Sequence, residues 1–146
     1  MKAKRYPRGA AFREACHAVV AWSLGLGVRA VRISDDDARD AAEIGCADLS
    51  LIEQIALCSA GIAAENAFEC PADELAGTHD REKIYKLLKA NEISEEDQCE
   101  ALRGKGYNWA RECLGAHMGE VIRLAERLAQ RGRVDASEFL HLMRAN

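Results

Sequence analysis

Two side chains near the start of the chain could carry out metal-assisted hydrolysis. Residues 13–17 read Arg-Glu-Ala-Cys-His, so Glu14 and His17 share one face of a predicted helix. In the zinc-binding helix of many metallopeptidases, two histidines four residues apart bind Zn²⁺, and the glutamate after the first activates the bound water. Arg13 stands at the position of the first histidine. A Glu-x-x-His pattern alone is a weak signal, because it arises readily by chance.

The surrounding segments resemble the peptidase domain of the FtsH-type ATP-dependent zinc metallopeptidases. REACHAVVAWSLG (13–25) is similar to that family's HEAGHAVV helix. CSAGIAAENAFE (58–69) resembles its small-residue helix, and AGTHDREKIYKLL (76–88) resembles the segment that carries a metal ligand. HMGEVIRLAERLAQRGRVDASEF (117–139) is similar to its closing helix pair. The likeness follows the family's order across nearly the whole chain.

The resemblance implies a zincin-like domain whose zinc is held by two histidines and a downstream aspartate. By position, Glu14 matches the general base, His17 the second histidine and Asp80 the aspartate ligand. Asp80 also lies four residues before Ile84 and seven before Leu87, which places it on the apolar face of its own helix. A carboxylate that points into the protein interior needs a hydrogen-bond or ion-pair partner. The alternative for Asp80 is a helix-start residue stabilised by the helix dipole.

Three positions depart from the family pattern. Arg13 replaces the first ligand, Cys16 replaces a glycine, and His79 replaces the asparagine before the aspartate. A guanidinium does not lose its proton to bind zinc. One interpretation is that Arg13 forms an ion pair with Asp80 or Glu14 where the metal would lie. The domain would then keep its fold and lose its hydrolytic chemistry.

The rival interpretation is an altered zinc site, in which His79 or Cys16 joins His17 and Asp80. Adjacent residues of a helix point about 100° apart. Cys16 beside His17, or His79 beside Asp80, therefore converges poorly on one ion. We favour the interpretation in which charge replaces the metal, with zinc absent or weakly bound.

Two functions follow from these interpretations. The first is a stand-alone FtsH-type peptidase-like domain that acts as a binding or regulatory module for unfolded polypeptides or peptides, with a separate ATPase or protease subunit as a further partner. The second is an active zinc metalloendopeptidase with an altered ligand set, which cleaves unfolded chains. A third and less favoured interpretation is a helical domain that shares only its packing with the family. A homo-oligomer is compatible with each of them.

Charge and cysteine content exclude several classes of protein. The 146 residues include 24 acidic and 20 basic side chains, a net charge of −4, which disfavours nonspecific binding to nucleic acid. No apolar run is long enough for membrane insertion, and no signal-like segment opens the sequence. The six cysteines form no C-x-x-C pair, so we expect a cytoplasmic protein with reduced, mostly buried thiols.

The hydrophobic pattern predicts one mainly α domain over residues 1–146, with roughly five to six helices and a small β element near the N-terminus. No G-x-x-x-x-G-K-[ST] motif is present, so no ATPase module is expected. Glu65, in an apolar central helix, matches a glutamate of the family that the chain resembles and is expected to be a structural carboxylate held by hydrogen bonds. The other predicted boundaries are helices over 10–24, 49–69 and 78–91, a helix from 94 kinked at Gly104 or Gly106, helices near 121–132 and from 135, and strands over 28–33 and 42–46.

Overall fold

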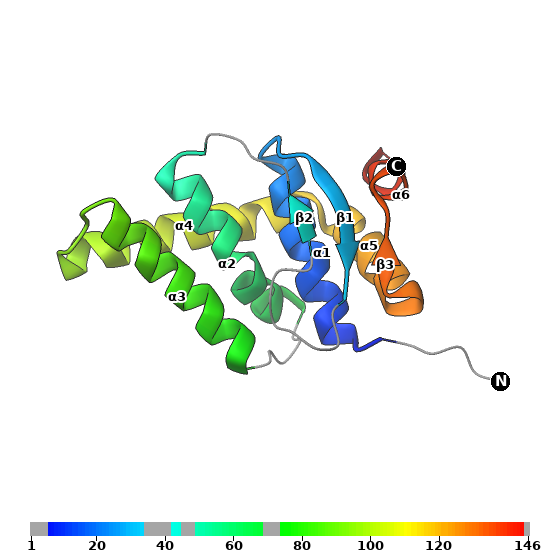
Figure 1. Cartoon of the computed structure of the whole chain (residues 1–146), viewed down its shortest axis with the longest axis horizontal. Coiled ribbons are helices and arrows are strands. Elements are labelled where there is room, and N and C mark those ends of the chain that lie inside the picture. The colour runs from blue at the N-terminus through cyan, green and yellow to red at the C-terminus, as the bar shows by residue number, and fades with distance from the viewer. Residues whose placement is uncertain (1–5, 34–41, 45–48, 69–73, 145–146) are drawn as a thin grey trace.

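The computed structural model describes residues 6–33, 42–44, 49–68 and 74–144, with the backbone alone at 42–44 and 74–79. Six helices and three short strands lie in this part of the chain, which confirms a mainly α fold (Figure 1). In chain order they are α1 (Arg8–Ser23), β1 (Val28–Arg32), β2 (Ala42–Ile44), α2 (Leu51–Phe68), α3 (Glu74–Ala90), α4 (Glu96–Ala116), α5 (Met118–Arg131), β3 (Arg133–Val134) and α6 (Ala136–Arg144).

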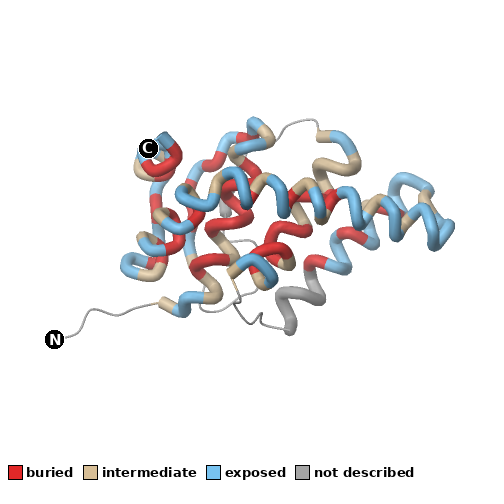
Figure 2. Tube along the Cα trace, turned by 180° about the vertical axis from the view of Figure 1, so that it is seen from behind, coloured by how far each residue is buried: buried red, intermediate tan, exposed pale blue. Residues whose placement is uncertain are grey.

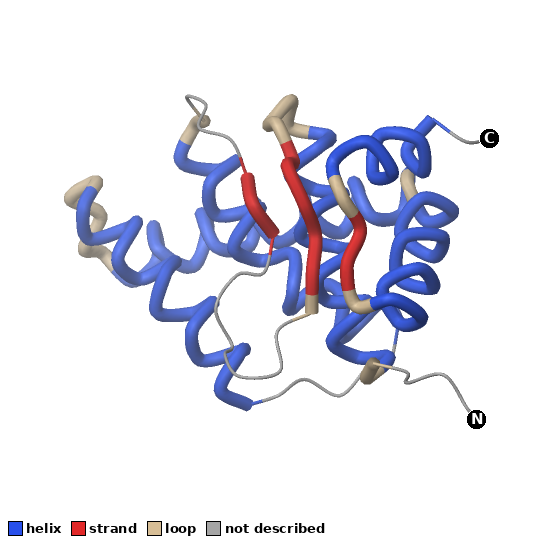
Figure 3. The backbone as a smooth tube through the Cα atoms, turned by 45° about the vertical axis from the view of Figure 1, so that its right-hand side comes forward, coloured by secondary structure: helices blue, strands red, loops and turns tan. Residues whose placement is uncertain are grey.

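Helix α1 lies at the centre of the molecule. It packs against α2, α4 and α5, and the sheet covers another of its sides (Figures 1 and 3). Its small residues make this close approach possible, because the side chains of Ala11, Ala15, Ala18 and Ala21 are all fully buried. Figure 2 shows that the buried segments gather around this helix, whereas the end of the molecule where α3 and α4 meet is mostly exposed. The core therefore surrounds the segment that carries Arg13 and His17.

The sheet has three strands in the order β2-β1-β3, with β1 antiparallel to both neighbours (Figure 3). The two-stranded prediction was therefore incomplete, since Val134 of β3 pairs with Val31 of β1. A strand of two residues is too short to show an alternating pattern. The pairing of β1 with β2 shifts register between Val28 and Ala30. Ala30 and Val31 are both buried, against the predicted alternation, because β1 contacts both α1 and α6.

Two helix starts differ from the sequence prediction. Helix α3 begins at Glu74 rather than at Thr78. Helix α4 begins after Glu95 rather than at Ser94. Its first turn contains acidic residues, whose negative charges interact favourably with the positive end of the helix dipole. Helix α4 continues without a break through Gly104 and Gly106 to Ala116.

The start of α6 matches the predicted capping pattern. The backbone N–H of Glu138 donates a hydrogen bond of 2.9 Å to Asp135 Oδ1, which satisfies one of the open donors of the first helical turn. The Glu138 carboxylate accepts hydrogen bonds of 3.0 Å from both Arg127 and Arg131. These contacts join α5 to α6 across the turn at Gly132, whose φ of 75° ends α5.

The cap at Asp135 predicts a specific acid dependence of stability. The backbone N–H of Glu138 and then the Ser137 hydroxyl lower the pKa of Asp135 below its usual value of 3.8. A carboxyl group whose pKa is lower in the folded state stabilises the fold above the unfolded pKa and loses that contribution as pH falls through the folded value. We expect the unfolding free energy of Asp135→Asn to depend less steeply on pH than that of wild type below about pH 4. Urea titrations across this range test the expectation, and identical slopes would contradict it.

Four cysteines lie in the described part of the chain, and each is a thiol outside any disulfide. Only Cys16 is buried, whereas Cys58, Cys99 and Cys113 are half-buried. The expectation of mostly buried thiols is therefore wrong for these three, which lie on helices with one side toward solvent. Cys46 and Cys70 lie outside the described residues. Within the described residues no helix has the length and apolar character needed to cross a membrane.

Candidate functional site

The candidate site lies where α1 and α3 face the middle of α2. Arg13 and His17 are four residues apart on α1, so the two side chains leave the helix on the same side, one turn apart. Asp80 lies on α3. It is almost completely buried, as its spacing from Ile84 predicts, and Ile84 is buried too. The amphipathic pattern of α3 therefore carries a carboxylate into the interior.

Arg13 and Asp80 form a buried ion pair. Arg13 Nη2 donates a hydrogen bond of 2.7 Å to Asp80 Oδ2, with side chains that are 15% and 2% exposed. The short distance is typical of a charge-assisted hydrogen bond. The sequence predicted that Asp80 would approach Arg13 or His17, and the contact with Arg13 confirms this. The dipole-stabilised alternative is wrong for Asp80, since its carboxylate is buried and paired.

The His17 side chain lies beside the Arg13–Asp80 ion pair, and all three side chains lie next to Gly61 of α2. A Cβ atom added at Gly61 would lie 2.8 Å from Asp80 Oδ2, 3.0 Å from His17 Nε2 and 3.1 Å from the Arg13 Cζ. The three side chains therefore meet against the bare backbone of α2. Any side chain at Gly61 would occupy the space that they fill. The prediction that small residues of this helix allow a close approach is confirmed here.

The groups that meet at Gly61 do not fit a catalytic zinc site. His17 Nε2 and Asp80 Oδ2 are potential ligand atoms, but the third group is a guanidinium, which has no lone pair to donate. Three protein ligands and an open position are the usual requirement. Within the described residues no cluster of three or more His, Cys, Asp or Glu side chains could hold a metal ion. The arrangement can hold a fixed positive charge beside a carboxylate and an imidazole.

The remaining predicted site residues are more scattered. Glu14, the expected general base, is half-buried next to Arg13. Cys16 is fully buried within the hydrophobic core, which disfavours it as a substitute ligand. Glu65 is half-buried on α2, and its role as a structural carboxylate stays a prediction. His79 belongs to α3, but its side chain lies outside the described part of the structure.

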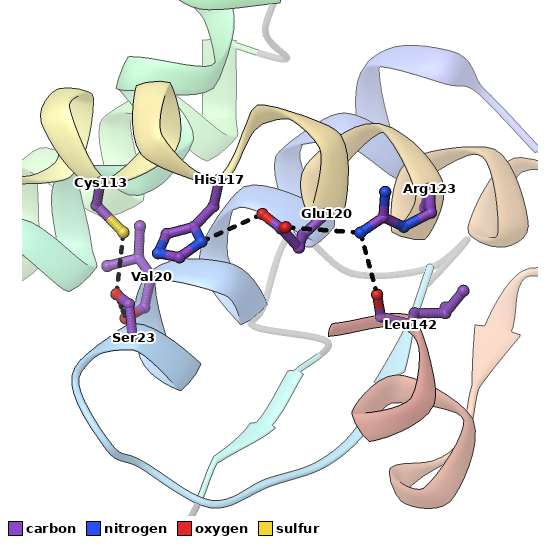
Figure 4. Close-up of polar contacts among 7 residues, drawn as sticks. All are labelled: Val20, Ser23, Cys113, His117, Glu120, Arg123 and Leu142. Atoms are coloured by element: carbon purple, nitrogen blue, oxygen red, sulfur yellow. Dashed lines mark hydrogen bonds and ion pairs between the residues drawn. The ribbon is translucent and has the colours of Figure 1, made fainter. Parts of the chain in front are cut away.

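A second polar cluster, which the sequence did not predict, joins the end of α1 to α4 and α5 (Figure 4). Ser23 Oγ and Cys113 Sγ share a hydrogen bond of 2.9 Å. Nearby, His117 Nδ1 lies 3.1 Å from Glu120 Oε2, and the same carboxylate contacts Arg123. The only sequence signal was the His-x-x-Glu spacing across the start of α5.

This second cluster is structural and not nucleophilic. Burial raises the pKa of the Cys113 thiol, and the hydrogen bond from Ser23 offsets that effect only in part. A raised pKa keeps the sulfur protonated at neutral pH, whereas a nucleophilic cysteine needs the thiolate. His117 packs edge-on against Trp22, with ring centroids 5.2 Å apart. These contacts anchor α1, and with it Arg13 and His17, against the junction of α4 and α5.

No protein-family model matches this chain, and no curated protein matches it in a sequence comparison. The resemblance to FtsH-type peptidases therefore stays a prediction that rests on the short motifs around Arg13, Gly61 and Asp80. The geometry of the ion pair does not depend on that resemblance.

Proposed function

We propose that this chain is a binding or regulatory module built on an FtsH-type peptidase-like fold, in which an internal ion pair replaces the zinc site. The observation that carries the proposal is the contact of Arg13 with Asp80 beside His17, at the point marked by Gly61. In the family that the chain resembles, a histidine at the Arg13 position and the aspartate would both bind zinc. Here the aspartate is neutralised by a side chain of the same chain.

The physical argument is one of charge. An arginine side chain carries a permanent positive charge in proteins. That charge repels a divalent cation at the same point and satisfies the Asp80 carboxylate with a short hydrogen bond. Zinc binding would require the Arg13 side chain to leave the interior, and Asp80 would have to give up its contact with Arg13 for a contact with zinc. The proposal therefore treats the domain as free of zinc or only weakly bound to it.

The partner we propose is an unfolded polypeptide or an extended peptide, with a separate ATPase or protease subunit as the further partner, in the cytoplasm. A sheet edge can pair with an extended peptide through backbone hydrogen bonds, and this pairing does not require a metal. The sheet lies beside α1, which contacts β1 and β2. Because β1 has partners on both sides, the edges available for this binding belong to β2 and β3.

The test of the proposal restores the missing ligand. Arg13→His would place two histidines four residues apart around Glu14, with Asp80 as the third ligand and a fourth position for water. We expect purified Arg13→His to hold about one zinc per chain, whereas wild type holds far less. Arg13→Ala is the matched control, since it removes the positive charge without adding a ligand, and it should gain no zinc. Elemental analysis after dialysis against a weak chelator measures the metal content.

Proteolysis of an unfolded substrate separates the two candidate functions. Wild type should show no chelator-sensitive cleavage, while Arg13→His should gain zinc and with it weak cleavage that depends on Glu14. One tightly bound zinc in wild type, together with chelator-sensitive cleavage, would reject the proposal in favour of an active zinc metalloendopeptidase with an altered ligand set. In that case His79→Ala should lose the metal, since His79 is the nearest candidate for the extra ligand.

A further inference from the structure

A cavity of about 600 Å³ lies between α2, α3 and α4. Helix α2 packs against both other helices, whereas α3 and α4 make almost no direct contact with each other in the described part of the chain. They meet at the turn after Ala90 and diverge from it, at the mostly exposed end of the molecule (Figures 1 and 2). The open space between the two helices is the cavity. Its volume falls within the range of about 300–1,000 Å³ that is typical of small-molecule sites.

The interior surface of this cavity is mostly apolar. Ile62 of α2 and Ile84 and Leu88 of α3 line it. Ile84 and Leu88 belong to a small hydrophobic cluster separate from the main core. Tyr85 also lines the cavity and is 65% exposed, the largest exposure among the large hydrophobic side chains described. Ile84 and Leu88 are themselves almost fully buried. The apolar surface that a ligand could cover therefore comes mainly from Tyr85 and the half-buried Ile62 and Ile93.

Positive charge surrounds this apolar surface. Arg81 and Lys89 of α3 and Arg103 of α4 all line the cavity and are exposed, against one acidic residue, Glu96. Helical spacing explains why apolar and basic side chains of α3 line the same cavity, because residues 81, 84, 85, 88 and 89 lie on one face of this helix. The whole chain has a net charge of −4, so this local excess of cations contrasts with the rest of the protein.

We propose that this cavity binds a monomeric amphiphile with an unbranched apolar chain and a terminal carboxylate, a fatty-acid-like anion. The apolar chain would lie against Ile62, Tyr85 and Ile93, and the carboxylate would pair with the cations at the rim. Arginine and lysine are the side chains that recognise carboxylates best. The site is separate from the Arg13–Asp80 ion pair, so this proposal goes beyond the proposed function and does not depend on it.

Calorimetric titration of the wild-type chain with decanoate, below the concentration at which it forms micelles, tests the proposal. We expect saturable binding of one decanoate per chain. Affinity should rise from octanoate to dodecanoate by up to about fourfold for each added methylene, the factor for a fully buried CH₂ group. Decanol, which has the same chain and no charge, should bind at least tenfold more weakly. An affinity that does not change with chain length, or equal binding of decanol, would overturn the proposal.

Variants of the rim locate the bound carboxylate. Lys89→Gln and Arg103→Gln should each weaken decanoate binding about three- to tenfold, and the double variant should weaken it further. Lys105→Gln is the matched control, because Lys105 is an exposed cation on α4 that does not line the cavity. It should leave the affinity unchanged. All the substituted residues are exposed, so circular dichroism should show the same fold in each variant.

Two outcomes would reassign the cavity. Equal weakening by Lys105→Gln and Arg103→Gln would show that decanoate responds only to the overall charge of α4, and would reject a defined site. Binding to vesicles containing anionic phospholipid, with no binding of monomeric decanoate, would reject the free amphiphile in favour of a membrane headgroup. Neither outcome would alter the zinc content of Arg13→His, so failure of this proposal is distinguishable from failure of the proposed function.

Discussion

Replacing Asp80 with alanine is expected to lower the free energy of unfolding by about 3–5 kcal/mol. The variant leaves the Arg13 guanidinium in a largely buried position without the carboxylate that accepts its 2.7 Å hydrogen bond. Removing one partner of a buried ion pair costs far more than the pair itself contributes, because the remaining charge keeps its desolvation cost. Urea unfolding followed by circular dichroism measures the difference.

A control on the same helix separates this effect from a loss of helix stability. Glu82 is an exposed acidic residue of α3, and Glu82→Ala should change the free energy of unfolding by less than about 0.5 kcal/mol. The double variant Arg13→Ala with Asp80→Ala should be more stable than Asp80→Ala alone, since it removes the uncompensated charge. A loss below about 1 kcal/mol for Asp80→Ala would contradict the description of a tightly coupled buried pair.

Gly106→Ala is expected to destabilise the fold by about 2–3 kcal/mol. Gly106 lies where α4 crosses α2, and a Cβ atom there would lie 2.4 Å from Ile55 Cγ2 and 3.1 Å from the backbone nitrogen of Ala56. The isoleucine side chain is fully buried and stiff at its branched carbon. Moving the Ile55 side chain or the backbone of α2 would cost too much energy, so α2 and α4 must separate to make room for the new methyl group. Thermal and urea unfolding both measure the loss.

Gly104 offers a matched control two residues earlier on the same helix. It is exposed, and no atom of the described residues lies within 4 Å of a Cβ added there. Gly104→Ala should therefore raise the free energy of unfolding by about 0.5–1 kcal/mol, because alanine is the better helix former. Opposite signs for the two variants would support close packing at Gly106. A stability gain from both would show that α2 and α4 are not in close contact at this point.

The sequence predicted most of the elements and part of the site. Runs of apolar and helix-favouring residues marked the helices, and the spacing of Asp80 from Ile84 predicted a buried carboxylate, as the structure has it. The resemblance to FtsH-type peptidases implied that Arg13 could pair with either Asp80 or Glu14. The choice between them depends on where α1 and α3 each pack against α2, and no local pattern encodes those positions.

Contacts between elements that are distant in sequence account for what could not be predicted. Small residues in α2 indicated a close approach, but not that Gly61 would be the residue facing Arg13 and His17. Strand β3 exists only because the turn at Gly132 aligns Arg133 and Val134 with β1. Helix starts were misplaced for a simpler reason, since several polar residues in succession can each cap a helix.

The central position of β1 sets an order for the assembly of the chain during synthesis. Because synthesis runs from the N-terminus to the C-terminus, β1 emerges from the ribosome well before its partner β3. Until Arg133 and Val134 are made, the strand has unpaired backbone groups along one side, which is the geometry that recruits strands from other chains. Pairing over so long a sequence separation also slows folding. The C-terminal segment thus closes the sheet last, and a nascent or truncated chain that ends before Gly132 carries an open, self-associating edge.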